Sequence, residues 1–322
     1  MGETILSVND LKVFFHARKL TVKAVNGVSY RLYRGQTLGL VGESGCGKTV
    51  SALAILRLLE TPPAEYRGGE ILFDGKDLFM LTEKQLRGIR GESISMIFQE
   101  PMTSLNPVLS IGFQIGEVLA VHRDLSPGEI KDKTVELLRM VGIPDPVKRA
   151  GEYPYQLSGG MRQRVMIALA LSCNPKVLIA DEPTTALDVT IQAQILELMV
   201  DLQNQLGTSI LMITHDMGVI AETAHRVAVM YAGKIVEEGD VGVIFNNPRH
   251  PYTQRLLQAI PRIDQSCLER LKEIPGMVPD LCFLPPGCSF FNRCPDRKDH
   301  CRHHEPELEI VENEHVVRCW SA

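Results

Sequence analysis

The spacing of apolar residues divides the chain into strand-rich and helical stretches. Residues 5–45 are predicted to be rich in β structure, because apolar side chains alternate with polar ones at Leu6, Val8, Leu11 and Val13. Continuous apolar runs predict further buried strands at Leu38–Val41, Lys176–Asp181 and Ser209–Thr214. Helices are predicted at Val50–Leu59 and at Thr190–Leu206, the second ending at Gly207.

A helical stretch interrupts this alternation. From Glu100 to about Leu157, helix-forming segments are separated by turns that proline and glycine mark. One helix start is explicit, since Ser126-Pro127-Gly128-Glu129 combines a capping box with proline at the first helical position. We therefore predict a helical subdomain at about residues 100–160, inserted into a domain that spans residues 1–245.

The composition changes after Phe245. Prolines interrupt the remaining residues, which show little regular periodicity, and four cysteines follow at Cys288, Cys294, Cys301 and Cys319. We predict a small, irregular, cysteine-rich C-terminal domain at residues 246–322. With little core of its own, this extension would be stabilised by a bound metal.

Charge and hydropathy narrow the class of protein. The 322 residues carry a formal net charge of −5, with a sequence pI of about 6.0, so the chain has no general attraction for nucleic acid. No apolar run is long enough for a membrane span, and the N-terminus lacks the layout of a signal peptide. We expect a cytosolic protein whose eight cysteines stay reduced or hold metal.

A glycine-rich stretch lies between the strand at Leu38–Val41 and the helix at Val50–Leu59. It fits the P-loop pattern with the residues Gly42-Glu43-Ser44-Gly45-Cys46-Gly47-Lys48-Thr49. Glycines let backbone N–H groups turn toward a phosphate chain, and the helix N-terminus adds partial positive charge. We expect Lys48 to neutralise the β- and γ-phosphates of a nucleoside triphosphate, and the Thr49 hydroxyl to bind Mg²⁺.

Two residues near this motif carry open expectations. Phe15 could stack on a purine base, or it could be an ordinary strand residue that half faces the core, and the pattern favours neither. Cys46 is interpreted as a small spacer in the P-loop, and its position at a helix N-terminus adds the hypothesis that its thiol pKa is lowered, which would make it open to alkylation.

Two further motifs follow the P-loop in the chain. The first is Leu157-Ser158-Gly159-Gly160-Met161 and the second is Asp181-Glu182, which ends a predicted strand. With the P-loop, they make residues 5–245 resemble the ATP-binding subunit of ABC transporters, a P-loop NTPase with a RecA-like α/β core, an antiparallel β portion and a helical subdomain. Within that family the chain is similar to the D-type subunit of oligopeptide/dipeptide importers. The stretches that carry this closer similarity are Phe98-Gln99-Glu100-Pro101-Met102-Thr103-Ser104-Leu105-Asn106-Pro107, His250-Pro251-Tyr252-Thr253 and the C-terminal cysteines.

The resemblance implies a role for each motif residue. Asp181 would hold Mg²⁺, Glu182 would polarise the attacking water, and Gln99 would contact Mg²⁺ or that water. His215 would donate a hydrogen bond to the γ-phosphate, and Asp188 would line a dimer interface. The expected catalytic residues are Glu182, His215, Gln99 and Lys48. The expected nucleotide contacts are Phe15, Gly42, Ser44, Gly45, Cys46, Gly47, Lys48, Thr49, Gln99, Asp181 and Asp188, with Ser158, Gly159 and Gly160 meeting the γ-phosphate bound by the opposite subunit.

The four C-terminal cysteines leave alternatives open when they are judged from the residues alone. Their spacing lacks the close pairs typical of zinc sites, and disulfides are disfavoured in a cytosolic protein. An iron–sulfur cluster, a zinc ion and unmetallated thiols all remain. The family resemblance implies that Cys288, Cys294, Cys301 and Cys319 hold a four-iron four-sulfur cluster.

The resemblance also implies partners and a location. We expect an ATP hydrolase at the cytoplasmic face of the membrane, paired with a homologous second ATPase subunit, although the isolated subunit could form a homodimer. Two transmembrane permease subunits would join this pair, an extracytoplasmic peptide-binding protein would act indirectly, and no nucleic acid is expected. Di- or oligopeptides are the expected cargo. The alternatives are an importer of nickel or another small solute, and a DNA-repair or translation ATPase.

Overall fold

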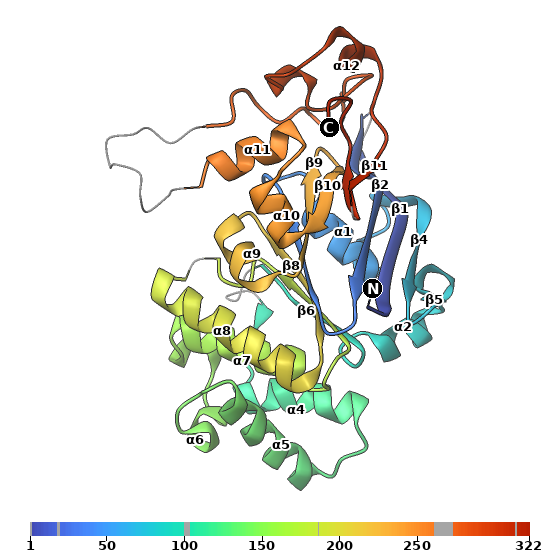
Figure 1. Ribbon diagram of the computed structural model, residues 1–322. Coiled ribbons are helices and arrows are strands. Elements are labelled where there is room, and N and C mark those ends of the chain that lie inside the picture. The colour runs from blue at the N-terminus through green and yellow to red at the C-terminus, as the bar shows by residue number, and fades with distance from the viewer. Residues whose placement is uncertain (1, 18–19, 100–103, 186, 261–272, 313) are drawn as a thin grey trace. The chain divides into compact units, whose positions relative to one another are not determined.

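The computed structural model describes residues 2–17, 20–99, 104–185, 187–260, 273–312 and 314–322 (Figure 1). Its contacts divide the chain into two compact units. Unit 1 consists of Met1–Ile5, Leu32–Gln36 and Met80–Met212, and unit 2 consists of Leu6–Arg31, Thr37–Phe79 and Ile213–Ala322. Over the described ranges, no helix is long and apolar enough to cross a membrane. Residues 100–103 begin the predicted helical subdomain and belong to the stretch 98–107, which carries part of the similarity to importers. They lie outside the described residues.

Unit 2 contains most of an antiparallel sheet with the strand order β2-β1-β4-β5. Its strands are β1 (Thr4–Ala17), β2 (Leu20–Tyr33), β4 (Ala64–Phe73) and β5 (Lys76–Asp77). The apolar positions of β1 change from even to odd numbers between Val8 and Leu11, and the β1–β4 register is irregular at this point, with Asp10 at a φ of +48°. This bulge keeps both halves of the apolar pattern buried. The prediction of β structure in residues 5–45 is confirmed.

The second set of strands in unit 2 has the order β11-β12-β10-β9-β3. Strand β3 is parallel to β9, while β9 and β10 are antiparallel. Every residue of β3 and β9 is buried, as the apolar run Leu38–Val41 predicts for β3. The strands are β3 (Thr37–Val41), β9 (Arg226–Tyr231), β10 (Lys234–Asp240), β11 (Glu309–Glu312) and β12 (His315–Val317).

The C-terminal residues are more regular at this edge than their sequence predicts. Strand β12 pairs with β10 in an antiparallel register that places Val317 opposite Glu237. The buried side chains of His315 and Glu237 also meet, with 2.7 Å between Nε2 and Oε1. This polar contact lies between distant segments, so no local periodicity in the sequence could reveal the two added strands.

Helices complete unit 2. Helix α1 begins at Lys48, directly after the P-loop, and ends at Ile55 rather than at the predicted Leu59. The helices are α1 (Lys48–Ile55), α9 (Met217–Thr223), α10 (Val241–Asn246), α11 (Pro251–Gln258) and α12 (Asp299–His303), with a 3-10 turn, η3, at Phe291–Arg293. A second 3-10 turn, η1 (Leu78–Met80), lies at the boundary of the units.

Unit 1 contains the strand order β8-β7-β6 and a group of helices. The strands are β6 (Ile94–Ile97), β7 (Val177–Asp181) and β8 (Ser209–Thr214), of which residues 209–212 belong to this unit. Strands β6 and β7 are parallel, and all their residues are buried. The helices are α2 (Glu83–Ile89), α4 (Ile111–His122), α5 (Pro127–Met140), α6 (Pro146–Ala150), α7 (Gly159–Leu171) and α8 (Val189–Leu206), with a 3-10 turn, η2, at Pro154–Gln156.

The helical part of unit 1 follows its sequence signals closely. Helix α4 packs against α5, α6 and α7 (Figure 1). At the start of α5, Ser126 and Glu129 form the predicted capping box, and Pro127 occupies the first turn. Helix α8 ends at Gly207, whose φ of +69° is the left-handed geometry that favours glycine. The predicted capping box and helix end are therefore confirmed.

Candidate functional site

Two glycines of the P-loop in unit 2 are required because a side chain would clash with neighbouring backbone, and a third has a backbone conformation that favours glycine. Gly47 has a φ of +103°, and a side chain there would place its Cβ 2.2 Å from the carbonyl oxygen of Ala24. A Cβ at Gly42 would lie 2.1 Å from the carbonyl oxygen of Met230. Gly45 also has a positive φ, but nothing lies within 4 Å of the position that its Cβ would take. Neighbouring backbone thus dictates Gly42 and Gly47, while Gly45 leaves space beside the loop.

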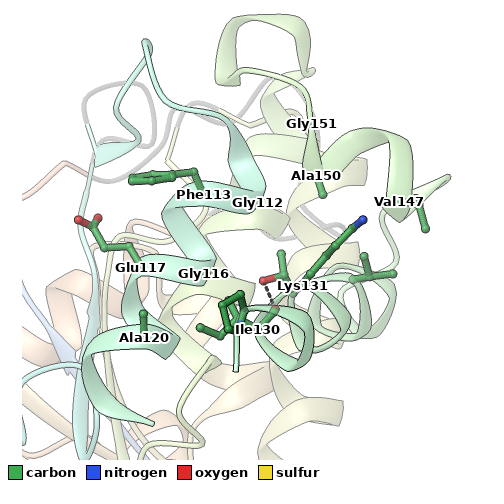
Figure 2. A pocket seen from close by; sticks show the side chains of 13 residues that line it. Gly112, Phe113, Gly116, Glu117, Ala120, Ile130, Lys131, Val147, Ala150 and Gly151 are labelled. Atoms are coloured by element: carbon green, nitrogen blue, oxygen red, sulfur yellow. Dashed lines mark hydrogen bonds between the residues drawn. The ribbon is translucent and has the colours of Figure 1, made fainter. Parts of the chain in front are cut away.

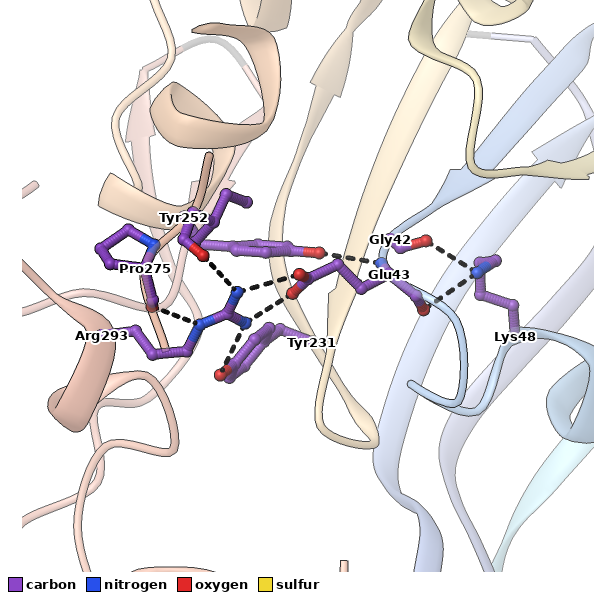
Figure 3. A network of polar contacts seen from close by, with 8 residues as sticks. Gly42, Glu43, Lys48, Tyr231, Tyr252, Pro275 and Arg293 are labelled. Carbon is purple, nitrogen blue, oxygen red and sulfur yellow. Dashed lines mark hydrogen bonds and ion pairs between the residues drawn. The ribbon is translucent and has the colours of Figure 1, made fainter. Parts of the chain in front are cut away.

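Lys48 is buried at the first position of α1, where it folds back on the loop. Its Nζ donates hydrogen bonds to the carbonyl oxygens of Gly42 and Glu43, at 2.8 and 3.2 Å (Figure 3). Both acceptors are neutral backbone groups, so the ammonium charge has no carboxylate partner among these bonds. The ammonium group can therefore exchange these carbonyl acceptors for an anion that enters the loop.

The hypothesis that the Cys46 thiol has a lowered pKa is wrong. Its side chain is fully buried, and burial raises the pKa of the thiol above its usual value. The neighbouring Lys48 charge opposes this shift but does not overcome it. Cys46 is therefore a packed, protonated thiol, because desolvation outweighs the effect of the helix N-terminus.

The other predicted ligands of the nucleotide in unit 2 lie around the same loop or on strand β1. Ser44 is exposed, and Thr49 is half-buried in the first turn of α1. Phe15 is a half-buried residue of β1 opposite Ala64 of β4, which leaves both of its expected roles open. His215 directly follows β8 and is exposed, and the next residue, Asp216, caps α9 by accepting the backbone N–H of Gly218 at 2.8 Å.

Unit 1 brings three of the predicted polar residues together at the end of β7. Asp181 is the buried last residue of that strand, and Glu182 follows with a φ of +48°, an uncommon value for a residue with a side chain. Gln99 Nε2 donates to Glu182 Oε2 at 3.1 Å, and Thr185 Oγ1 donates to the same oxygen at 2.9 Å. A strained backbone and a carboxylate held by two donors are features of a functional site.

The Ser158–Gly160 motif forms the N-terminus of α7 in unit 1. Ser158 caps this helix by accepting the backbone N–H of Met161 at 3.3 Å. Gly159 is exposed, whereas a Cβ at Gly160 would lie 2.9 Å from Ile191 of α8. Asp188 caps α8 in the same way, accepting the backbone N–H of Ile191 at 3.0 Å. Gly160 thus has a packing role besides any role toward a ligand.

The four cysteines expected to hold metal share one pocket in unit 2. All four are free and partly buried, and they line the pocket together with aromatic residues that include Phe291 and Trp320. Burial raises the pKa of Cys288 to about 11 and also raises the pKa of Cys294 and Cys319. Within the described part of the chain, no three His, Cys, Asp or Glu side chains are placed to hold a single metal ion.

Sequence reasoning missed a polar network that holds Glu43, the second residue of the P-loop (Figure 3). Arg293 forms two hydrogen bonds with the Glu43 carboxylate, at 2.6 and 2.9 Å, and Tyr252 Oη accepts the Glu43 backbone N–H at 2.9 Å. Tyr231, Tyr252 and Phe290 pack around this network with ring centroids 4.7–5.5 Å apart. Tyr252 belongs to His250–Thr253, one of the stretches that carry the similarity to importers. Arg293, by contrast, has no sequence signal nearby that would connect it with the P-loop.

Unit 1 also contains an apolar pocket of about 590 Å³ between α4, α5 and α6 (Figure 2). Phe113 and Gly116 of α4, Ile130 of α5 and Val147 of α6 contribute to its lining. Its charged lining residues are Glu117 and Lys131. The predominance of apolar groups suits contact with another apolar surface better than chemistry on a polar substrate.

Comparison with known proteins connects these features. The family described as "ABC transporter" matches residues 25–185, and the one described as "Oligopeptide/dipeptide transporter, C-terminal region" matches residues 236–301. The chain is 52% identical over 318 residues to the dipeptide transport ATP-binding protein DppD of Bacillus subtilis (strain 168), which covers 99% of this chain and 95% of that protein. It is 53% identical over 316 residues to the oligopeptide transport ATP-binding protein OppD of the same organism. That alignment covers 98% of this chain and 88% of OppD.

Solved structures give a consistent result for the fold. The ATP-binding cassette MJ0796, in a dimeric post-hydrolysis state bound to ADP and Pi, aligns with a TM-score of 0.66 and 26% identity. That alignment covers 73% of this chain and 98% of the cassette. CbiO1 from Clostridium perfringens aligns with a TM-score of 0.64 and 29% identity, covering 76% and 92%. The P-loop NTPase fold of an ABC cassette, predicted from the motifs, is therefore confirmed.

Proposed function

This chain belongs to the ATP-binding subunits of ABC transporters, in their oligopeptide/dipeptide importer branch, and on that basis we propose that it hydrolyses ATP to power peptide import. The observation that carries the proposal is the P-loop, in which the described hydrogen bonds of the buried Lys48 go to two backbone carbonyl oxygens and the Cys46 sulfur, and to no carboxylate. The match to DppD and OppD over nearly the whole chain supplies the substrate class.

ATP binding is assigned to unit 2. The P-loop backbone from Gly42 to Gly47 would surround the β- and γ-phosphates, and Lys48 would exchange its two carbonyl acceptors for phosphate oxygens. Phe15 is a candidate for stacking on adenine because it is only half-buried. Thr49 of α1 is the candidate Mg²⁺ ligand in unit 2, and Asp181 and Gln99 are the candidate Mg²⁺ ligands in unit 1. Mg²⁺ would supply charge neutralisation on the phosphates.

Hydrolysis is assigned to the carboxylate that follows β7. Glu182 would accept a proton from the attacking water, and the donors Gln99 and Thr185 would orient its carboxylate. His215 would donate a hydrogen bond to the γ-phosphate as negative charge develops on it. The positive φ of Glu182 supports this assignment, because such strain persists where the surrounding structure fixes a residue for function.

The partner ATPase subunit would contribute to each active site. The exposed N-terminus of α7, at Ser158 and Gly159, offers backbone N–H groups that can bind the γ-phosphate held by the opposite subunit. Gly160 would allow the close approach, and Asp188 would lie at the interface. A homologous second ATPase is the proposed partner, while two copies of this chain could pair when it is isolated.

The permease subunits are the proposed partners of the helical part of unit 1. The apolar pocket between α4, α5 and α6 supports this assignment, because exposed apolar surface of this kind typically marks a protein contact. The insert follows Gln99 in the chain, so a permease bound there would act on the segment that contacts Glu182. The subunit would then sit peripherally at the cytoplasmic face of the membrane, with the extracytoplasmic peptide-binding protein acting indirectly.

The four cysteines would hold a four-iron four-sulfur cluster. A zinc ion requires its ligands to converge at about 2.3 Å from one point, whereas a cluster spreads its four thiolates around a larger core. Cys288, Cys294, Cys301 and Cys319 line one pocket, and this shared pocket is what supports the proposal. Burial raises the pKa of Cys288, Cys294 and Cys319, and backbone hydrogen bonds to each sulfur oppose that rise, as they would for thiolates that bind a cluster. When bound, the cluster would cross-link residues 288–319.

We also propose that the chain divides into two domains at residue 245. Residues 1–245 would form the nucleotide-binding domain with its helical subdomain at about 100–160, and residues 246–322 the importer-specific extension. The match of the oligopeptide/dipeptide C-terminal family to residues 236–301 supports a boundary in this region.

ATP turnover by the purified chain tests the proposal. Glu182→Gln should lower kcat by roughly 10²–10⁴-fold, because it removes a general base, and should leave the affinity for the analogue AMP-PNP within about twofold. Glu222→Gln, an exposed carboxylate on α9, is the matched control and should keep normal turnover. Unchanged turnover in Glu182→Gln would exclude Glu182 as the base. Strong stimulation of turnover by DNA would favour the DNA-repair alternative, and import of nickel but not peptides in the assembled transporter would change the cargo.

A further inference from the structure

The side chain of Glu43 joins the P-loop to Arg293, which directly precedes Cys294, one of the four C-terminal cysteines. We use "cysteine segment" for the described residues 273–312 and 314–322. Arg293 of this segment is buried, with its side chain 4% exposed, and the Glu43 side chain is 29% exposed. Each N–H of the guanidinium has an acceptor in the described structure: the two Glu43 oxygens, the Tyr231 hydroxyl and the carbonyl oxygens of Ile274 and Pro275.

The backbone of Glu43 is held as firmly as its side chain. Its N–H donates to the hydroxyl of the fully buried Tyr252, and the N–H of Tyr252 in turn donates to His250 Nδ1 at 3.0 Å. On the other side, the Glu43 carbonyl oxygen accepts a hydrogen bond from Lys48 Nζ (Figure 3). The same residue thus connects Arg293 with the lysine that is assigned to the phosphates.

We propose that Arg293 positions the P-loop through Glu43, and that nucleotide affinity therefore depends on the folded state of the cysteine segment. The inference rests on the proposed ATP-binding function of the loop. Its physical basis is the asymmetry of a buried ion pair: loss of one partner leaves an unpaired charge in a desolvated site, and the chain moves to hydrate it. A shift of Glu43 would displace the carbonyl oxygen that holds Lys48.

The cysteine segment has a direct mechanical connection to this pair. Arg293 is the last residue of the 3-10 turn η3 and is followed at once by Cys294, one of the four residues that line the thiol pocket. The backbone N–H groups of Arg293 and Cys294 donate to Phe290 and Phe291, at 3.0 and 3.4 Å. A change at Cys294 therefore acts on the backbone that carries the guanidinium.

The test is the affinity of the full-length chain for AMP-PNP. Arg293→Met, which removes the charge and keeps much of the length, should weaken binding about tenfold, within the usual range for coupled sites. Arg293→Lys, which keeps the charge but loses the two-pronged contact, should weaken it only about threefold. In steady-state hydrolysis, KM should rise in both variants while kcat changes less than about twofold, because the reacting groups are untouched.

Arg318 provides a matched control. It precedes Cys319 as Arg293 precedes Cys294, but it donates to the carbonyl oxygens of Ile235 and Pro306, at 2.9 and 3.2 Å. Arg318→Met should lower the Tm and leave AMP-PNP affinity within about twofold at a temperature where both variants are folded. Equal loss of affinity in Arg293→Met and Arg318→Met would mean that Arg293 acts only by folding the segment, and its positioning of the P-loop through Glu43 would be wrong.

A double-mutant cycle tests whether the effect passes through Glu43. In a Glu43→Gln background there is no carboxylate to leave unpaired, so Arg293→Met should change AMP-PNP affinity less than about twofold. The same tenfold loss in both backgrounds would contradict transmission through Glu43.

Hydrogen exchange of the nucleotide-free protein separates this inference from the proposed function. Arg293→Met should accelerate exchange of the amides at residues 42–47, and Arg318→Met should not. Faster exchange together with a Lys48→Ala variant that binds AMP-PNP normally would overturn the proposed ATP site and retain the positioning of the loop. Unchanged exchange would overturn the positioning role while ATP binding stands.

Discussion

Lys48 and Arg293 are two buried cations that contact the same P-loop residue, and they do so in opposite ways. Lys48 donates to the backbone carbonyl oxygens of Gly42 and Glu43, which are neutral acceptors. Arg293 binds both oxygens of the Glu43 carboxylate. Hydrogen bonds with an ionised donor or acceptor are about twice as strong as neutral ones, but only the bonds of Arg293 join opposite charges, and its planar guanidinium holds the carboxylate in one orientation.

This difference separates a cation that is available to a ligand from one that belongs to the scaffold. Lys48 can exchange its carbonyl acceptors for phosphate oxygens and gain a charged partner. Arg293 already has its charged partner, and moving it would leave the half-buried Glu43 carboxylate unpaired. Burial alone does not distinguish the two roles; the charge of the acceptor does.

The largest effect is expected from removal of the ligand-binding cation. Lys48→Ala should weaken AMP-PNP binding by roughly 100-fold or more, because it removes charged hydrogen bonds worth about 1.5–3 kcal/mol each, and ATP turnover should be lost. Equilibrium titration of the purified variant measures this change. Lys84→Ala, at an exposed position of α2, is the control and should bind normally. Normal binding by Lys48→Ala would remove the distinction drawn between the two cations.

A smaller effect is expected from the thiol site that stands next to Arg293. Cys294→Ser should abolish the iron and sulfide content of protein purified without oxygen, and should weaken AMP-PNP binding about tenfold, as Arg293→Met does. Cys282→Ser is the control, because this free thiol is half-buried in the same segment and is not among the residues that line the four-cysteine pocket. Loss of iron with unchanged nucleotide affinity would show that the cluster staples the segment without acting on the P-loop. Iron retained in Cys294→Ser would exclude this residue as a ligand.

The two cations also show how far sequence reasoning reaches. Lys48, Thr49 and the loop glycines were predictable because a phosphate chain is bound by consecutive residues, so the requirement appears as a local pattern. The capping box at Ser126 was predictable for the same reason, since its hydrogen bonds join residues three positions apart. The contact between Arg293 and Glu43 spans 250 positions and leaves no periodic or compositional signal.

The burial of Cys46 marks a different limit. Its place at a helix N-terminus is visible in the sequence and predicts a low thiol pKa, but the neighbours that desolvate it come from elsewhere in the chain. Burial then raises that pKa. The C-terminal strands show the same limit, because β12 pairs with β10 across a long stretch of sequence. Contacts between distant residues decide these features, and a single sequence does not specify which distant residues meet.

The smallest effect is expected from a contact confined to the helical part of unit 1. Its removal shows how a local loss of stability behaves when nucleotide affinity is not affected. Ser126→Ala removes the cap of α5 and should lower the free energy of unfolding by about 1 kcal/mol, with AMP-PNP affinity unchanged.

Hydrogen bonds from Ser126 lower the pKa of Glu129, so the folded state favours the ionised carboxylate. This stabilisation is present above the unfolded pKa of about 4.3 and is lost as pH falls through the folded value. The difference between the wild type and the variant in denaturant titrations should therefore be largest at neutral pH and smaller in acid, where the bond between the Glu129 N–H and the Ser126 hydroxyl remains. A difference that grows in acid would contradict the ionic contribution of Glu129, and a change in AMP-PNP affinity would show that capping of α5, too, affects the nucleotide site.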